Sequence, residues 1–305
     1  MKVESLDVEL PQATLQVPYV TVTGEQPGPH LTVIAGVHGT EYTSIAAARE
    51  FARSLDAAVV RGTITVAPLV NPAAFWARSP FVVPLDGKNL NRSFPGDPGG
   101  SAAEVLAHRL TKAFIEPADY LLDLHAGDLP EALEPFALYD ESPVEAQARQ
   151  MAIAYGLGHV VRQTRAARTV GGSTSAVAAD LGKPAITAES GQNGILERVA
   201  VDRHLAGLAG VCAHLGVLPG EPKTASAPRE HEGWDWLRTP VAGWWEPTVA
   251  TGENVAAGQL IGVVGDVLGG GRHEVRSPSD GVPLFVTSSP AVEADGLLIG
   301  IARGH

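Results

Sequence analysis

The chain has 305 residues, 45% of them hydrophobic and 18% charged, which is enough for one large domain and a smaller one. Its net charge of −12 disfavours binding to nucleic acid or to an anionic membrane surface. No stretch approaches the roughly 18 consecutive apolar residues of a membrane span, and the N-terminal residues lack the apolar run of a secretory signal. A single cysteine, Cys212, excludes a disulfide framework. We therefore expect a soluble, cytoplasmic protein whose partners include neither nucleic acid nor membrane.

The first hundred residues alternate between strand and helix patterns. Residues 1–28 predict an edge hairpin of short strands, and the apolar run at 31–37 predicts a strand buried on both faces. A helix is predicted over 45–55 and a second buried strand over 62–71. The long segment that follows, to about residue 100, is rich in turn formers but also contains aromatic residues. It is therefore predicted to be a packed, functional loop.

The alternation continues for more than a hundred residues. Helices are predicted over 102–114, 144–155, 173–181 and 195–215, and strands over 119–125, 136–139, 159–162 and 184–189. This order predicts an α/β domain at 1–220 with a mostly parallel, mixed sheet flanked by helices. Composition then shifts towards Pro, Ser and charge, which predicts a linker at 221–240. Short apolar runs between glycine turns predict a small all-β, barrel-like domain at 241–305.

Polar side chains follow two predicted strands at their C-terminal ends. His38 and Glu41 follow the first buried strand, and His125 ends a later one. Because carboxyl ends of parallel strands meet at one edge of a sheet, we expect these side chains to lie together. Two histidines and a glutamate are typical of a catalytic zinc site with an open fourth position, although His38 alone would be interpreted as an ordinary loop histidine. Asp123 would lie on the same side of its strand as His125, and either orients that imidazole or has a helix end or solvent as its partner.

Further residues could serve a reaction at such a metal. Glu189 ends a later strand, where a carboxylate can carry a proton between water and a leaving amine; a salt-bridged edge glutamate is an equal alternative. Asn91 and Arg92 place an amide beside a guanidinium in the long loop, and this pair suits a carboxylate ligand. Arg78, in the same loop, is a candidate second cation for substrate binding, with a surface role as the favoured alternative.

These motifs occur in an order that resembles a known family. The pattern is His38-x-x-Glu41, Asn91-Arg92, His125 and Glu189, within the strings GVHGTEYTS, NPAAF, DGKNLNRSFPG, DLHAG and ITAESGQNG. It resembles the succinylglutamate desuccinylase and aspartoacylase family, which are zinc hydrolases with a carboxypeptidase-like α/β fold. The resemblance implies one zinc ion per chain on the His–Glu–His set, a substrate carboxylate held by Arg92 with Asn91, and Glu189 as catalytic acid and base. It also implies that the β-rich tail from about Val241 is similar to a biotinyl or lipoyl carrier barrel and walls the mouth of the active site.

Two departures narrow this interpretation. Peptide-cleaving carboxypeptidases carry a tyrosine shortly before the catalytic glutamate, whereas no tyrosine follows Tyr155 here. A carrier barrel needs an attachment lysine, and no lysine follows Lys223. Within the family, the flanks of the motifs look most like deacylases of small N-acetylated amino acids, of the N-acetyl-diaminobutyrate deacetylase type.

The predicted function is therefore zinc-dependent hydrolysis of the amide bond in a small N-acylated amino acid, most simply an N-acetyl one. The alternatives are a metallocarboxypeptidase acting on peptides or cell-wall peptides, and a catalytically silent binding module. Ser173, Thr174 and residues 162–169 are candidates for the pocket that selects the substrate. Whether the chain forms a homo-oligomer is left open.

Overall fold

A nine-stranded sheet forms the centre of the chain in a computed structural model that describes residues 2–10, 13–167, 172–220 and 227–304. The strand order is β1-β2-β4-β3-β5-β9-β7-β8-β10. The strands are β1 (Lys2–Glu9), β2 (Thr14–Thr23), β3 (Gln26–Ala35), β4 (Arg61–Ala67), β5 (Tyr120–His125), β7 (Phe136–Asp140), β8 (His159–Gln163), β9 (Ala185–Glu189) and β10 (Arg229–Glu232). Pairing is parallel from β4 through β3 and β5 to β9 and from β7 through β8 to β10, and antiparallel elsewhere. The predicted mixed sheet and its N-terminal edge hairpin are both confirmed.

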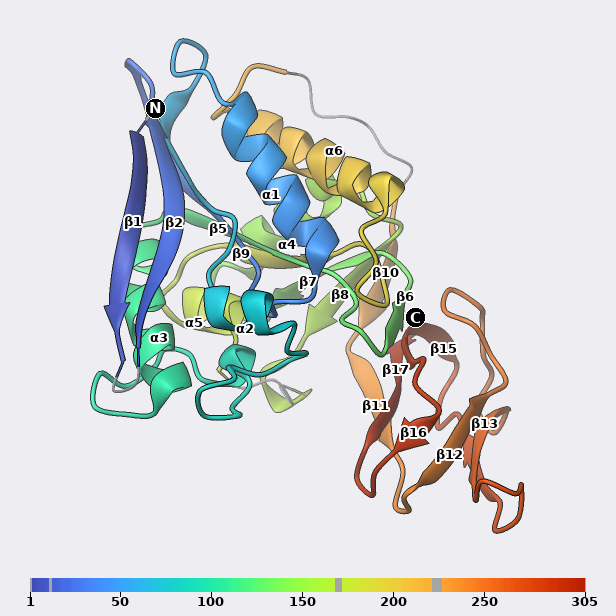
Figure 1. Cartoon of the computed structure of the whole chain (residues 1–305). Coiled ribbons are helices and arrows are strands. Elements are labelled where there is room, and N and C mark those ends of the chain that lie inside the picture. The colour runs from blue at the N-terminus through green and yellow to red at the C-terminus, as the bar shows by residue number, and fades with distance from the viewer. Residues whose placement is uncertain (1, 11–12, 168–171, 221–226, 305) are drawn as a thin grey trace.

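Helices cover both faces of this sheet (Figure 1). On one face lie α1 (Tyr42–Ser54), α4 (Glu145–Tyr155) and α6 (Arg198–Leu215), and on the other α3 (Ala102–Leu110), the π-helical turn η2 (Thr111–Ile115) and α5 (Thr174–Asp180). Successive residues of β5 point to opposite faces, so Leu122 and Leu124 join the first core while Leu121 joins the second. This explains why Leu121, Leu122 and Leu124 are all apolar, and it places Asp123 and His125 on the α5 side.

The predicted long loop contains regular structure. It holds α2 (Pro72–Ala77) and the 3₁₀ turn η1 (Leu90–Arg92). A further 3₁₀ turn, η3 (Arg165–Ala167), lies outside this loop and follows β8. Asn71 caps α2 through a hydrogen bond from the Ala74 amide to its Oδ1 at 3.2 Å, and Asn89 caps η1 by accepting from the Asn91 amide at 2.8 Å. These caps fix the loop next to the sheet edge.

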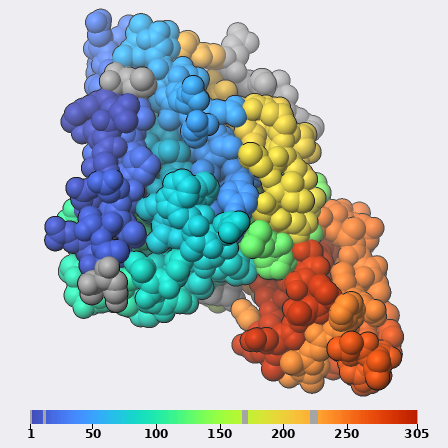
Figure 2. All heavy atoms as spheres, in the orientation of Figure 1, coloured from blue at the N-terminus to red at the C-terminus, as the bar shows by residue number. Residues whose placement is uncertain are grey.

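Two further sheets, of four strands each, form a separate lobe in Figures 1 and 2. All their strands except β6 come from the C-terminal part of the chain. The first has the order β11 (Trp234–Arg238), β17 (Leu297–Arg303), β15 (Gly281–Thr287) and β6 (Glu131–Leu133). The second has the order β14 (His273–Arg276), β13 (Leu260–Gly265), β12 (Gly243–Pro247) and β16 (Ala291–Val292). The separate antiparallel sheets agree with the predicted β-rich C-terminal region.

The segment 221–240, predicted as a linker, carries two strands, one in the nine-stranded sheet and one in a smaller sheet. Strand β10 adds to the edge of the nine-stranded sheet by parallel pairing with β8, and β11 pairs with β17 in the smaller sheet. Charged residues are tolerated in β10 because an edge strand is only half covered. Residues 221–226 of the predicted linker lie outside the described residues, and the boundary between the two domains stays a prediction. Among the helices that the structure describes, none is long and apolar enough to cross a membrane.

Candidate metal and active site

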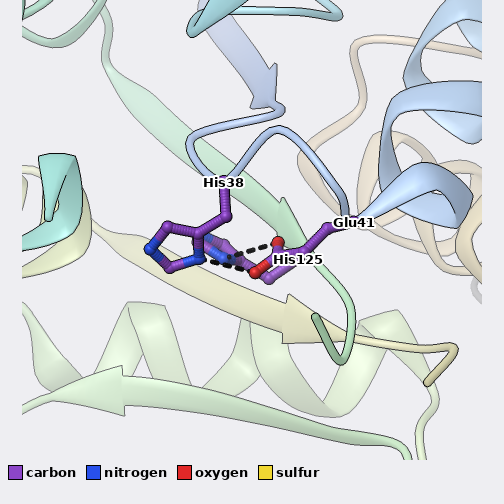
Figure 3. A group of neighbouring side chains, drawn as sticks. All are labelled: His38, Glu41 and His125. Carbon is purple, nitrogen blue, oxygen red and sulfur yellow. Dashed lines mark hydrogen bonds and ion pairs between the residues drawn. The ribbon is translucent and has the colours of Figure 1, made fainter. Parts of the chain in front are cut away.

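Two imidazoles and one carboxylate meet at the end of the parallel strands (Figure 3). His38 lies in the turn after β3, Glu41 precedes the first residue of α1, and His125 is the last residue of β5. Nδ1 of His38 is 2.6 Å from Oε1 of Glu41, and Nδ1 of His125 is 3.0 Å from Oε2. All three side chains are buried, and one potential ligand atom from each lies within 4.8 Å of the other two. The structure thus brings together the three residues that the sequence predicted as metal ligands.

Local chain geometry directs these side chains inward. A Cβ atom on Gly39 would lie 2.2 Å from the backbone nitrogen of Phe75 in α2, so only glycine fits between His38 and Thr40. Glu41 occupies the N-cap position of α1 but its side chain makes no capping hydrogen bond. Its carboxylate turns instead to the two imidazoles and accepts a hydrogen bond from the Ala126 amide at 3.2 Å.

Each imidazole has an oxygen partner on its far nitrogen. Nε2 of His125 lies 3.0 Å from Oδ2 of Asp123, which also accepts a hydrogen bond from the Thr174 hydroxyl. Nε2 of His38 lies 3.1 Å from Oδ1 of Asn89. Because a carboxylate or amide oxygen can only accept, each Nε2 carries a proton. Each Nδ1 faces a Glu41 oxygen, and a cation bound between them would replace the proton on Nδ1 and make this nitrogen the ligand atom. Asp123 therefore lies beside His125, as expected if it orients that imidazole.

The electrostatics of the cluster favour a cation. Burial alone would raise the pKa of Glu41, but the charges of His125 and His38 outweigh it and lower the pKa to about 2. Burial would lower the pKa of His125, yet Asp123 and Glu41 outweigh it and raise that pKa well above the ordinary value. The cluster thus stabilises positive charge between its rings, and its set of two nitrogen ligands and one oxygen fits zinc.

A pocket of about 420 Å³ opens onto the cluster. Asn91 and Arg92, from η1, line it, as do Ser173 and Gln163. The Oδ1 atom of Asn91 is buried and has no hydrogen-bond partner among the described residues. The guanidinium of Arg92 donates to the Asn91 carbonyl at 3.0 Å, and no described carboxylate lies within salt-bridge distance of it. The amide oxygen of Asn91 and the remaining N–H groups of the Arg92 guanidinium are therefore available to a ligand.

Glu189 also lines this pocket, at the end of β9. It lies opposite His125 in the parallel register, so the two side chains share one face of the sheet. Burial raises the pKa of Glu189 well above its ordinary value, His125 opposes the shift, and Glu41 and Glu131 add to it. Its Oε2 atom is buried without a partner in the described chain. A carboxyl group in this setting can hold and release a proton close to the metal ligands.

Some predicted residues lie away from the pocket. Arg78 is the C-cap of α2, is exposed, and is not among the residues that line the pocket. Thr174 lies behind His125 on Asp123, so it supports the site without facing the pocket. Arg162 forms ion pairs with Glu145 and other acidic residues outside the pocket. Residues 168–169 of the candidate run lie outside the part of the chain that the structure describes.

The resemblance implied that the β-rich tail walls the site, but the sequence did not identify the residues that do so. Glu131 lines the pocket from β6, and burial raises its pKa to about 8. Strands of the C-terminal sheet add Trp234, Trp236, Arg238, Phe285 and Leu297. The alternation of WDWLR is the one local signal that could have identified β11 as a strand with a lining face.

Comparison with known proteins agrees with this geometry. The model of the succinylglutamate desuccinylase/aspartoacylase catalytic domain matches residues 27–215. The N-alpha-acetyl-L-2,4-diaminobutyric acid deacetylase of Halomonas elongata is 30% identical over 273 residues, 86% of this chain and 79% of that protein. The crystal structure of a succinylglutamate desuccinylase/aspartoacylase from Rhodobacter sphaeroides has a TM-score of 0.90 and 25% identity, covering 100% of this chain and 95% of that one. The ectoine utilization protein EutE from Ruegeria pomeroyi, product-bound, shares the fold with a TM-score of 0.88 at 23% identity, covering 98% and 93% of the two chains. This chain belongs to the succinylglutamate desuccinylase/aspartoacylase family.

Proposed function

We propose that this chain is a zinc-dependent deacylase that hydrolyses the amide bond of a small N-acylated amino acid, with acetyl as the preferred acyl group. The observation that carries the proposal is that one pocket contains the buried His–Glu–His cluster, the unpaired carboxyl oxygen of Glu189 and the unpaired amide oxygen of Asn91 beside Arg92. A relative named for its action on an N-acetylated diamino acid supports the acyl group.

In this proposal His38, Glu41 and His125 hold the zinc ion. Zinc bound there supplies a Lewis acid that polarises the acyl carbonyl and makes water acidic enough to attack near neutral pH. Asp123 and Asn89 keep the two imidazoles in the tautomer that directs Nδ1 at the ion. The three ligands are held by β3, α1 and β5, which are parts of the rigid core.

Glu189 carries the proton in this mechanism. Its carboxylate accepts a proton as water attacks the acyl carbon, and its carboxyl then donates that proton to the nitrogen as the C–N bond breaks. Arg92 and Asn91 bind the carboxylate of the amino acid, which fixes the amide next to Glu189 and so lowers the entropic part of the barrier. The products are a free amino acid and a short carboxylic acid.

Release of free amine from N-acetyl, N-formyl and N-succinyl amino acids by the zinc-loaded protein tests this function. The panel should include neutral, acidic and amine-bearing side chains, with a chelator-treated sample as the control. We expect turnover on one or more N-acyl amino acids and its loss in chelator. Cleavage of peptides alone would establish the carboxypeptidase alternative, and full thermal stability in chelator with no bound metal would establish the silent binding module.

A further inference from the structure

One wall of the pocket comes from the C-terminal sheet, outside the matched catalytic domain. Trp234, Trp236 and Arg238 alternate along β11, so their side chains share one face, and all three line the pocket. The residues between them point the other way: Asp235 accepts a hydrogen bond from the Ser279 hydroxyl at 2.5 Å, and Leu237 packs against the C-terminal core. The pocket-facing side of β11 is therefore set by the pairing of this strand with β17.

The two tryptophans form a fixed aromatic wall. Their rings stack with centroids 4.8 Å apart and planes 24° apart, and Trp236 meets Phe285 edge-on at 5.9 Å. Trp236 crosses Gly300 of β17, where a Cβ atom would lie 2.6 Å from its ring. Both indole nitrogens are buried and have no hydrogen-bond partner in the described chain. This wall excludes water from one side of the pocket and leads to Arg238 at the end of β11.

Arg238 and Arg92 reach the same cavity from different parts of the chain. The Arg238 guanidinium donates to the Asp295 carbonyl at 2.5 Å and lies 3.9 Å from the Asp295 carboxylate, which leaves other N–H groups available. Burial lowers the pKa of Arg92, Glu131 opposes this, and the positive charge of Arg238 lowers it further. Both arginines line one pocket, and their like charges disfavour each other there.

We propose that Arg238 binds the carboxylate of the N-acyl amino acid together with Arg92, so that the C-terminal sheet completes the substrate site. This inference rests on the proposed function. A carboxylate between two guanidinium groups relieves their repulsion and accepts paired hydrogen bonds from each planar fork. Arg238 lies beyond residue 215, so this part of substrate recognition is outside the family's matched catalytic domain.

Steady-state kinetics of Arg238→Gln test the proposal in the full-length, zinc-loaded protein. With an N-acetyl amino acid that has a neutral side chain, the amino-acid carboxylate is the only anionic group on the substrate. We expect KM to rise about tenfold to a hundredfold, the range for losing a charge-assisted hydrogen bond, and kcat to change little. With the corresponding amino-acid amide, which lacks that carboxylate, Arg238→Gln should behave like the unmodified protein.

Arg276→Gln is the matched control. Arg276 has a side chain 51% exposed against 52% for Arg238, and likewise donates to a backbone carbonyl, that of Gly258, but it does not line the pocket. Arg238→Lys keeps the charge without the planar fork and should give an intermediate KM. Binding of the free amino-acid product, followed by tryptophan fluorescence, gives a readout that does not need turnover and should weaken in Arg238→Gln.

An unchanged KM in Arg238→Gln, or an equal loss for the acid and the amide, overturns the proposed contact. Equal effects of Arg238→Gln and Arg276→Gln overturn it as well. If the unmodified protein hydrolyses no N-acyl amino acid, the proposed function itself fails. The two failures are therefore distinguishable in one experiment.

Discussion

Replacing Glu189 by glutamine removes the proposed proton carrier while keeping the size of the side chain. A positioned acid or base contributes about 10²- to 10⁴-fold to a rate, or about 3 to 5 kcal/mol of barrier. We therefore expect kcat for an N-acyl amino acid to fall at least about a hundredfold. Zinc should stay bound, because Glu189 is not one of the three residues whose ligand atoms cluster. Since Oε2 is buried without a partner in the described chain, loss of the charge should not lower the melting temperature.

Turnover, zinc content and thermal unfolding are measured together on Glu189→Gln. The control is Glu246→Gln, which changes an exposed glutamate of β12 that does not line this pocket. Full turnover with zinc bound would refute the assignment of the proton transfer to Glu189. Loss of zinc along with turnover would also refute the reasoning, because Glu189 would then act through the metal.

Three further predictions follow from the same geometry. His125→Ala should abolish zinc binding and cost about 3 kcal/mol of folding stability, because it leaves the buried Asp123 carboxylate without its imidazole; metal analysis and urea unfolding check this. In metal-free protein, the pKa of Glu131 is raised from 4.5 to about 8. Between these pH values the folded chain keeps a proton that the unfolded chain has lost, so the free energy of unfolding falls as the pH rises. Glu131→Gln should therefore be more stable than the unmodified protein by about 1 to 3 kcal/mol at pH 8 and equal to it at pH 4, as measured by urea unfolding at both pH values. Gly300→Ala should displace Trp236 or cost about 1 to 3 kcal/mol, and either outcome should raise KM; an unchanged KM and melting temperature would contradict the packing described for this wall.

The metal cluster could be predicted from sequence because local rules place its members. A buried parallel strand must end at the same edge as its neighbours, and His38, Glu41 and His125 each follow or end such a strand. The period of two along β5 is enough to put Asp123 beside His125. The side of the sheet on which each residue lies needs only local information, whereas the meeting of His38 with His125 also requires the pairing of β3 with β5.

The choice between the two arginines of the long loop needed the structure. Asn89 caps η1, and this turn presents Arg92 to the pocket, whereas Arg78 ends α2 in a left-handed conformation and is exposed. The sequence favours Arg92, because it lies beside Asn91 in a motif, and favours a surface role for Arg78, but turn formers surround both residues and neither placement can be derived from them. What separates them is the direction of a short helical turn, which depends on caps and on packing against the sheet.

The residues of the second wall could not be identified from the sequence, because the strands that carry them pair over long distances. Strand β6 has three residues and pairs with β15, about 150 residues later, so its own pattern carries almost no signal. Strand β11 has a clear alternation, but it lies in a segment rich in Pro, Ser and charge, which predicts a linker. Its lining face is defined by β17, some 60 residues further on.

The two walls of the pocket therefore have different structural roles. In the α/β part, Nε2 of His204 is shared between the carbonyls of His125 and Ser190, at 3.0 and 3.2 Å, and Thr43 donates to the same Ser190 carbonyl at 2.7 Å. Burial lowers the pKa of His204 to about 4, so its ring is neutral near pH 7. Nε2 therefore donates to the two carbonyls, and Nδ1 accepts a hydrogen bond from the Tyr155 hydroxyl at 2.7 Å. Helices α1, α4 and α6 thus hold the strand ends that carry His125 and Glu189. Changes in this network should act on kcat by moving the reacting groups. Changes in β11 should act on KM, because in our proposal that strand contacts the substrate and carries no metal ligand.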